Sequence, residues 1–153
     1  MFVDSHCHID LAELAGQGEA LFARMLAARV SHAVCIGVRL EDMPGVLALA
    51  DARANVFATV GVHPENSEGE EATVERLVAL AAHPKVVGIG ETGLDYYWHK
   101  DRPEWQRERF RVHVRAARAL GLPLVIHTRD AADDVMRILR EERADEVGGV
   151  MHC

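Results

Sequence analysis

The sequence predicts an α/β fold built on a parallel sheet, and two features of its pattern carry this prediction. Short apolar runs recur along the chain with little polar alternation, which is typical of parallel strands buried on both faces. Longer amphipathic stretches separate these runs, and the strand midpoints advance by about 24 to 36 residues, the scale of a strand–helix–strand unit. The chain therefore repeats strand and helix and ends on a sixth strand.

Six apolar runs are the predicted strands: Phe2–Val3, Ala33–Gly37, Val56–Gly61, Val86–Glu91, Leu122–His127 and Gly149–His152. Five stretches between them are the predicted helices: Leu11–Arg29, Glu41–Arg53, Thr73–His83, Pro103–Leu120 and Ala131–Arg143. In the fourth helix, apolar side chains recur near the helical period of 3.6 residues: Trp105, Phe110, Val114 and Ala117. Pro103 suits a first helical turn, and Gly121 suits a helix stop.

The chain has 153 residues, near the most common domain size, and no linker or change of composition divides it. We therefore expect a single domain over residues 1–153. Two architectures fit the repeat. One is an open doubly wound sheet, which would place a glycine-rich turn after the first strand, where this chain has SHCHIDLAE. The other is a TIM (β/α)8 barrel with only about six strand–helix units present, because a complete barrel takes roughly 250 residues.

The net charge of −7 argues against a broad basic surface that coats duplex DNA, although it does not exclude a nucleic-acid substrate. From His99 to Arg118, seven basic residues stand against three acidic ones, a balance of +4 that we interpret as a solvated helix face.

No apolar run approaches the ~18 residues of a membrane span, and the N-terminus lacks a signal-peptide pattern. Cys7, Cys35 and Cys153 are widely spaced and odd in number, which indicates a reducing compartment, the cytoplasm.

Polar groups gather at the C-terminal ends of the predicted strands, and the histidines and carboxylates among them can bind metals: His6, His8, His63, Glu65, Glu91, Asp95, His127, Arg129, Asp130 and His152. His6 and His8 are two positions apart, and such side chains share one face of a strand. Barrel enzymes carry their sites on the loops at this end of the sheet, so the barrel is the favoured architecture. The remaining histidines lie off this pattern and are expected to be core or loop residues: His32, His83, His99 and His113.

Four histidines with one carboxylate suit Zn²⁺, Mn²⁺ or another first-row ion better than Ca²⁺. One tetrahedral ion would not use all of them, whereas two ions about 3.5–4 Å apart, bridged by a carboxylate, would. Glu91 lies between the pair His6 and His8 and the pair His127 and His152 in strand order, which makes it the candidate bridge. Two such ions activate a water and offset the charge on an attacked phosphoryl or carbonyl group.

Arg129 stands two residues beyond His127, on the same face if the strand continues. Its planar guanidinium could bind a phosphate oxygen. The alternative is an ion pair with Asp130 or Asp133.

Five segments together resemble the TatD family of metal-dependent deoxyribonucleases: VDSHCHIDL, GVHPE, GIGETGLDYY, LPLVIHTRDA and GGVMHC. The GLDYY form is most similar to its YcfH-type bacterial members, and the resemblance runs from Phe2 to Cys153. It implies a TIM barrel with two divalent ions (Mg²⁺, Mn²⁺ or Zn²⁺). It also implies a hydrolase that acts on DNA as a 3′–5′ exonuclease, or on another phosphodiester.

The motif match also implies roles for single residues. The implied metal ligands are His6, His8, Glu91, His127 and His152. The first two would bind one ion and the last two the other, with Glu91 as the bridge. The resemblance also implies that His63 lies near the substrate. Together with Arg129, added from its position beside His127, Glu91 and His63 form the expected catalytic set.

The sequence departs from the family after GVMHC. Family members continue through two more strand–helix units, which supply a further Asp to the first metal site. We therefore expect a truncated or incompletely recorded gene product, whose unclosed barrel would expose strand edges. No oligomeric state is predicted.

Two alternatives to the nuclease stay open. A C–N hydrolase of cyclic amides, similar to dihydroorotases, also begins with H-x-H. Such enzymes usually bridge their ions with a carbamylated lysine on the fourth strand, where this chain has Glu91, with Lys85 only before the strand. The second alternative is an inactive truncated fragment.

Overall fold

Six parallel strands form one sheet in a computed structural model that describes residues 1–11, 14 and 16–153. The strands are β1 (Phe2–Cys7), β2 (Val30–Cys35), β3 (Val56–Val60), β4 (Val86–Asp95), β5 (Leu124–Arg129) and β6 (Gly149–His152). The helices are α2 (Gly18–Ala27), α3 (Met43–Asp51), α4 (Val74–Ala81), α5 (Glu104–Leu120) and α6 (Ala132–Glu141), with short 3-10 turns η1 (Leu40–Asp42) and η2 (Ala144–Glu146).

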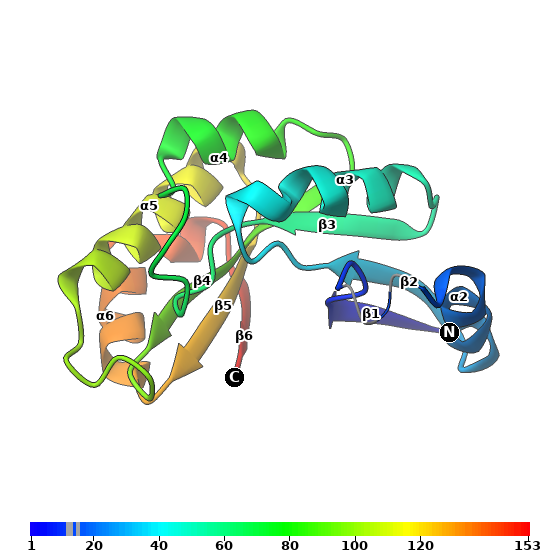
Figure 1. The fold of residues 1–153 in the computed structure, drawn as a ribbon. Coiled ribbons are helices and arrows are strands. Elements are labelled where there is room, and N and C mark those ends of the chain that lie inside the picture. Colours follow the sequence, from blue (N-terminus) through cyan, green and yellow to red (C-terminus); the bar gives the residue numbers. More distant parts are fainter. Residues whose placement is uncertain (12–13, 15) are drawn as a thin grey trace.

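The strands lie side by side in chain order, β1 to β6, without a reversal. A doubly wound sheet reverses its order at a switch point, whereas a barrel keeps the order of the chain. The sheet curls, and the helices follow its outer side (Figure 1). Among the described residues, β1 and β6 each bond to one neighbouring strand only. The predicted barrel architecture is therefore confirmed, as a curled half-barrel of six strands.

The core lies between the sheet and the outer helices. Phe110, Val114 and Ala117 of α5 are buried in it, as the helical period predicts. Trp105, which we placed on the same face, is instead 36% exposed. It lies five residues before Phe110, and at ~100° per residue this turns it about 140° around the helix. Helix α2 differs from the others because none of its described residues is buried.

Several predicted boundaries move in the structure. Strand β1 continues beyond Val3 and includes His6, and β2 begins at Val30 rather than Ala33. Strand β4 continues past Glu91 because residues 92–95 still pair with β5. Of the predicted helix 11–29, residues 12, 13 and 15 lie outside the described part of the chain, and α2 forms its later portion.

The predicted ends of the longest helix hold to within one residue. Pro103 is the residue just before α5, and Gly121 follows the helix with a φ of 66°. This left-handed conformation is the usual helix stop and suits a residue without a side chain. The residues around both ends of α5 therefore set its length by local backbone chemistry.

Among the described residues, no helix combines the length and the apolar character needed to cross a membrane. Cys7, Cys35 and Cys153 are all free thiols. The reducing compartment inferred from them stays a prediction.

Candidate metal centre

Glu91 lies in the middle of β4, and its side chain is only 2% exposed. Its backbone N–H donates to the carbonyl of Gly37, 2.8 Å away. Two positions later, Gly93 has a φ of 136°, and a side chain there would collide with the carbonyl of His127 on β5. A glycine at this position allows the close approach of β4 and β5 that brings Glu91 and His127 together.

Five histidines surround the Glu91 carboxylate, and they come from segments far apart in the chain. The Glu91 Oε2 atom faces His6 Nε2 at 3.3 Å and His8 Nε2 at 4.0 Å. The Glu91 Oε1 atom faces His63 Nε2 at 3.3 Å and His127 Nδ1 at 3.2 Å. His152 Nε2 also contacts Oε1, at 2.5 Å. We call these six residues the imidazole cluster, and in it each carboxylate oxygen faces a different set of rings.

The donor atoms of the imidazole cluster fit divalent metal ions. Two groups have their ligand atoms within 4.8 Å of one another: His6, His8 and Glu91, and His63, Glu91 and His127. Imidazole nitrogen and carboxylate oxygen are common ligands of first-row divalent ions. Among the described residues, every ion-pair partner of Glu91 is a histidine, so no fixed Lys or Arg charge already neutralises it.

This grouping differs in one respect from the predicted ligand set. His63, expected near the substrate, lies in the second group, whereas His152 contacts Glu91 but lies outside that group. All five predicted ligands lie in the imidazole cluster, and their role as ligands stays a prediction.

The environment keeps Glu91 ionised and His6 neutral. Burial raises the pKa of the Glu91 carboxyl, but hydrogen bonds with His127, His63 and His152 outweigh burial and hold this pKa well below its usual range. Burial is the main reason that the pKa of His6 is lowered. A neutral imidazole next to an anionic carboxylate is the protonation state that a cation needs.

Asp95, the last residue of β4, holds His127 from the far side of its ring. The Asp95 Oδ2 atom lies 3.0 Å from His127 Nε2 and can accept a proton held on that nitrogen, while Nδ1 on the other side of the ring lies 3.2 Å from Glu91 Oε1. Burial lowers the pKa of His127, but its hydrogen bonds to Glu91 and Asp95 raise it overall. A carboxylate behind a ligating histidine fixes the tautomer and the orientation of the ring.

The loop of residues 62–66 carries His63, and α5 holds this loop in place. Three hydrogen bonds connect them: Gln106 Nε2 donates to the Pro64 carbonyl (2.8 Å), the Val62 N–H donates to His113 Nε2 (3.0 Å), and Arg109 Nη1 donates to the Asn66 carbonyl (2.5 Å). The Glu65 N–H donates to His63 Nδ1 at 3.2 Å, so in the neutral ring the proton lies on Nε2. In that tautomer Nε2 lies 3.3 Å from Glu91 Oε1 as a hydrogen-bond donor and not as a ligand of an ion.

The imidazole cluster opens onto a hollow of about 440 Å³. Its lining residues are His8, Leu11, Val38, His63, Glu65, Asn66, Glu91, His127 and His152. Arg129 lies beyond it, with its guanidinium carbon 3.8 Å from the centre of the Tyr97 ring. Among the described residues, Arg129 forms no ion pair, so the alternative pairing with Asp130 or Asp133 is absent there.

The sequence placed Asp95 among the polar groups at the strand ends but gave it no role, and it did not single out Gln106. Gln106 lies four residues before Phe110, on the buried face of α5, and is itself fully buried. An amide where the helical period requires an apolar residue is the signal that identifies it.

The four histidines expected to be core or loop residues lie outside the imidazole cluster. His113 is buried, with Nδ1 2.8 Å from the Arg109 carbonyl. The other three contact local partners: His32 stacks on Phe57, His83 Nε2 lies 3.3 Å from Asp51, and His99 contacts Trp105. Strand-end position therefore separated the cluster histidines from the rest.

Comparison with known proteins identifies metal-dependent hydrolases and a DNase family as similar to this chain. The profile of the family described as TatD related DNase matches residues 3–153. The chain is 40% identical to the uncharacterized metal-dependent hydrolase YcfH of Escherichia coli, over 99% of this chain and 58% of the relative. It is 34% identical to the protein named 3′-5′ ssDNA/RNA exonuclease TatD of Enterobacter lignolyticus, over 92% of this chain and 55% of the relative.

The fold comparison agrees. The crystal structure of YJJV, a TatD homolog from Escherichia coli, matches with a TM-score of 0.87 and 28% identity, over 94% of this chain and 57% of that one. The chain spans about three fifths of the length of the curated relatives YabD and YcfH that it matches. The family profile covers nearly every residue, and the relatives' names and the candidate ligand groups both support the use of a divalent metal. The chain therefore belongs to the TatD related DNase family.

Proposed function

We propose that the protein hydrolyses phosphodiester bonds of DNA, as a 3′–5′ exonuclease, with two divalent ions bound at the imidazole cluster. One observation carries the proposal: a single buried carboxylate presents each of its oxygens to a different set of imidazole rings. Divalent ions bound there would lower the pKa of a water and offset the charge on the attacked phosphoryl group. The description of the family as DNases and the exonuclease name of one relative support the choice of substrate.

Three further side chains would orient a metal ligand or bind the substrate. Asp95 holds the His127 ring in the orientation that presents Nδ1 to the centre. His63 carries its proton on Nε2 in the neutral ring, so it can donate a hydrogen bond to a substrate oxygen in the hollow. Arg129 has no carboxylate partner among the described residues and is available to bind a phosphate.

The C–N hydrolase is the less favoured alternative, for a structural reason. Its expected bridge is a carbamylated lysine on the fourth strand. The nearest candidate, Lys85, precedes β4 and donates through Nζ to the carbonyls of Arg53, Ala54 and Val56 at 2.9 to 3.2 Å. These contacts hold Lys85 at the N-terminal end of the strands, away from Glu91. On β4 itself, the side chain that the histidines surround is that of Glu91.

Substituting Glu91 tests the proposal. Glu91→Gln keeps the shape of the side chain but removes the charge, so we expect cleavage of an end-labelled single-stranded DNA with added Mg²⁺ or Mn²⁺ to fall at least about 100-fold. Glu75→Gln, the same change in the first turn of α4, is the matched control and should keep the full rate. A Glu91→Gln protein that cleaves at near the full rate would overturn the two-ion assignment. Metal-dependent cleavage of a cyclic amide but not of DNA would favour the alternative.

A further inference from the structure

Two large aromatic rings remain exposed beside the imidazole cluster. Strand β4 is followed by three consecutive aromatic residues, and the first, Tyr96, is buried and donates its hydroxyl to Asp134 at 2.6 Å. The next two turn outward: Tyr97 is 42% exposed and Trp98 is 62% exposed. Their rings meet edge to face, with centroids 4.8 Å apart. The core does not use the outer surface of these rings, so it is open to a ligand.

Asp95 fixes these rings relative to the candidate metal centre. Its Oδ1 atom accepts the backbone N–H groups of Tyr97 and Trp98 at 3.0 and 3.1 Å, while its Oδ2 atom meets His127 Nε2. One carboxylate therefore anchors both the aromatic turn and an imidazole of the cluster. The turn is therefore connected to the cluster through a single side chain.

Arg129 completes this surface from the neighbouring strand. It lies two residues beyond His127 on β5, which places it about 6–7 Å further along the same face. Its guanidinium carbon is 3.8 Å from the centre of the Tyr97 ring and 5.8 Å from that of Trp98. One face of Tyr97 is thus covered by Arg129, and Trp98 is the more exposed ring.

We propose that Tyr97, Trp98 and Arg129 form a stacking platform that binds an unpaired nucleotide next to the bond to be cleaved. In this arrangement the base stacks on Trp98, and Arg129, which lies over the Tyr97 ring, binds the adjoining phosphate. Exposed aromatic rings beside an unpaired arginine are the means by which proteins bind single-stranded nucleic acid, because every base has a face to stack. In a duplex the bases are already stacked, so the platform selects single strands.

This inference rests on the proposed function but is tested by binding rather than by cleavage. The chain has only two tryptophans, Trp98 and Trp105, and both rings lie beside an arginine. Trp105→Phe leaves Trp98 as the single fluorophore, and Trp98→Phe leaves Trp105. In EDTA, which prevents cleavage, we expect oligo(dT) to quench the emission of the Trp105→Phe protein and to leave that of the Trp98→Phe protein unchanged.

Affinity gives the second readout, from the anisotropy of a labelled oligo(dT). Trp98→Ala should weaken Kd about 5- to 100-fold, the loss that follows removal of one stacked base. Trp105→Ala is the matched control and should leave Kd unchanged. Arg129→Lys should give a smaller loss than Arg129→Ala, because lysine keeps the charge but not the flat face.

Three results would overturn the platform: equal quenching in both single-tryptophan proteins, an unchanged Kd in Trp98→Ala, or a blunt duplex that binds as tightly as the single strand. The same holds if oligo(dT) fails to bind the unaltered protein at low salt. The proposed function fails separately, if the metal-loaded protein cleaves no oligonucleotide although binding and quenching are as expected.

Discussion

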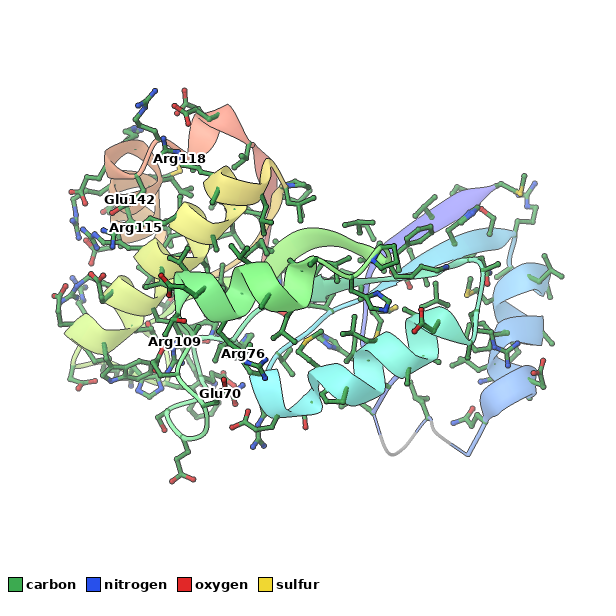
Figure 2. All side chains as sticks on the ribbon, turned by 90° about the horizontal axis from the view of Figure 1, so that it is seen from above. Glu70, Arg76, Arg109, Arg115, Arg118 and Glu142 are labelled. Carbon is green, nitrogen blue, oxygen red and sulfur yellow. The ribbon has the colours of Figure 1, made fainter. Side chains whose placement is uncertain are left out.

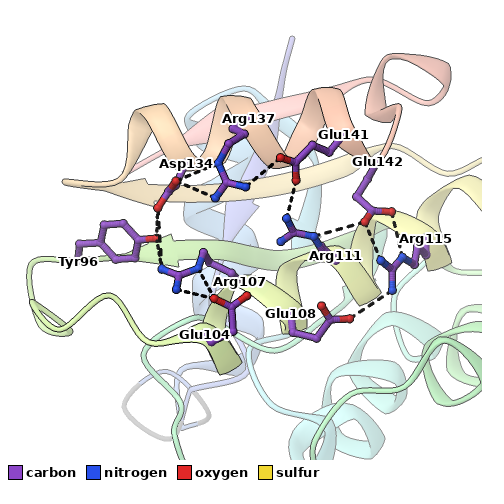
Figure 3. A network of polar contacts seen from close by, with 10 residues as sticks. All are labelled: Tyr96, Glu104, Arg107, Glu108, Arg111, Arg115, Asp134, Arg137, Glu141 and Glu142. Carbon is purple, nitrogen blue, oxygen red and sulfur yellow. Dashed lines mark hydrogen bonds and ion pairs between the residues drawn. The ribbon is translucent and has the colours of Figure 1, made fainter.

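Two charged regions of this protein are built in opposite ways. In the imidazole cluster, the Glu91 carboxylate meets only histidine rings, and no arginine or lysine among the described residues pairs with it. On α5 and α6, arginines meet carboxylates of the same protein: Arg107, Arg111, Arg115, Arg137, Glu104, Glu108, Asp134, Glu141 and Glu142 (Figure 3). In the second region, which we call the arginine network, every charge has a partner of opposite sign within the protein. The first leaves a negative charge for a cation from outside.

The arginine network also corrects the interpretation of the local charge of +4. The stretch of residues 99–118 is not simply a solvated helix face, because Arg111, Arg115 and Arg118 pair with acidic residues that follow much later in the chain. Arg115 meets Glu142 of the neighbouring segment at 2.7 Å (Figure 2). Arg118 meets Glu146 at 2.8 Å. Arg111 is only partly accessible and contacts Glu141 at 2.5 Å. A charge count along the sequence cannot show such pairing, which depends on how α6 packs on α5.

The largest expected effect is on the pH dependence of stability, and it comes from His113. Unlike the histidines around Glu91, His113 forms its hydrogen bonds with backbone groups and not with a carboxylate. Its ring bonds the Val62 N–H and the Arg109 carbonyl, and full burial lowers its pKa to about 4, with Arg109 and Glu71 as the nearest charges. The unfolded chain takes up this proton near pH 6.5, but the folded protein does so only near pH 4. Stability is therefore kept above pH 6.5 and lost as pH falls, by about 3 kcal/mol between pH 7 and pH 4.

The measurement is urea unfolding at several pH values for the unaltered protein and for His113→Gln. We expect the variant to have a lower free energy of unfolding at pH 7. Between pH 7 and pH 4, however, it should lose about 3 kcal/mol less than the unaltered protein. Parallel pH profiles of the two proteins would show that His113 does not titrate as its burial requires.

Asp95→Asn should give the next largest effect, on metal affinity. Asparagine can still accept the backbone N–H groups of Tyr97 and Trp98, but its amide cannot both do so and accept the proton of His127. We expect affinity for Mn²⁺ or Zn²⁺ to fall about 10- to 100-fold in titration calorimetry. Asp134→Asn, which changes a carboxylate of the arginine network, is the control. If both variants lost the same metal affinity, Asp95 would have no special role at the imidazole cluster, and this prediction would be wrong.

Arg115→Ala should give the smallest effect. Its ion pairs with Glu142 and Glu108 lie at the surface, where water and salt weaken them, so the free energy of unfolding should fall by less than about 1 kcal/mol. The difference from the unaltered protein should shrink further in 1 M NaCl, where charges are screened within ~3 Å. A larger loss that salt does not change would mean that Arg115 acts through packing.

The sequence predicted the architecture and the members of the cluster because both follow from short-range patterns. Short apolar runs predict buried parallel strands. Because a parallel sheet brings the C-terminal ends of its strands to one edge, His6 and His127 could be expected to lie together. Three features were not predictable in this way. Gln106 and His113 act through the packing of α5 on the loop of residues 62–66, and Arg129 stacks on Tyr97 instead of pairing with an acid. Each depends on contacts between segments far apart in the chain.

The most direct test of the central claim is to locate bound ions in crystals grown with Mn²⁺, by anomalous diffraction. Our account predicts two peaks beside Glu91, one next to each carboxylate oxygen, with His6 and His8 near the first and His127 near the second. Crystals that show no peak at Glu91, or ions bound only to surface carboxylates, would contradict the account.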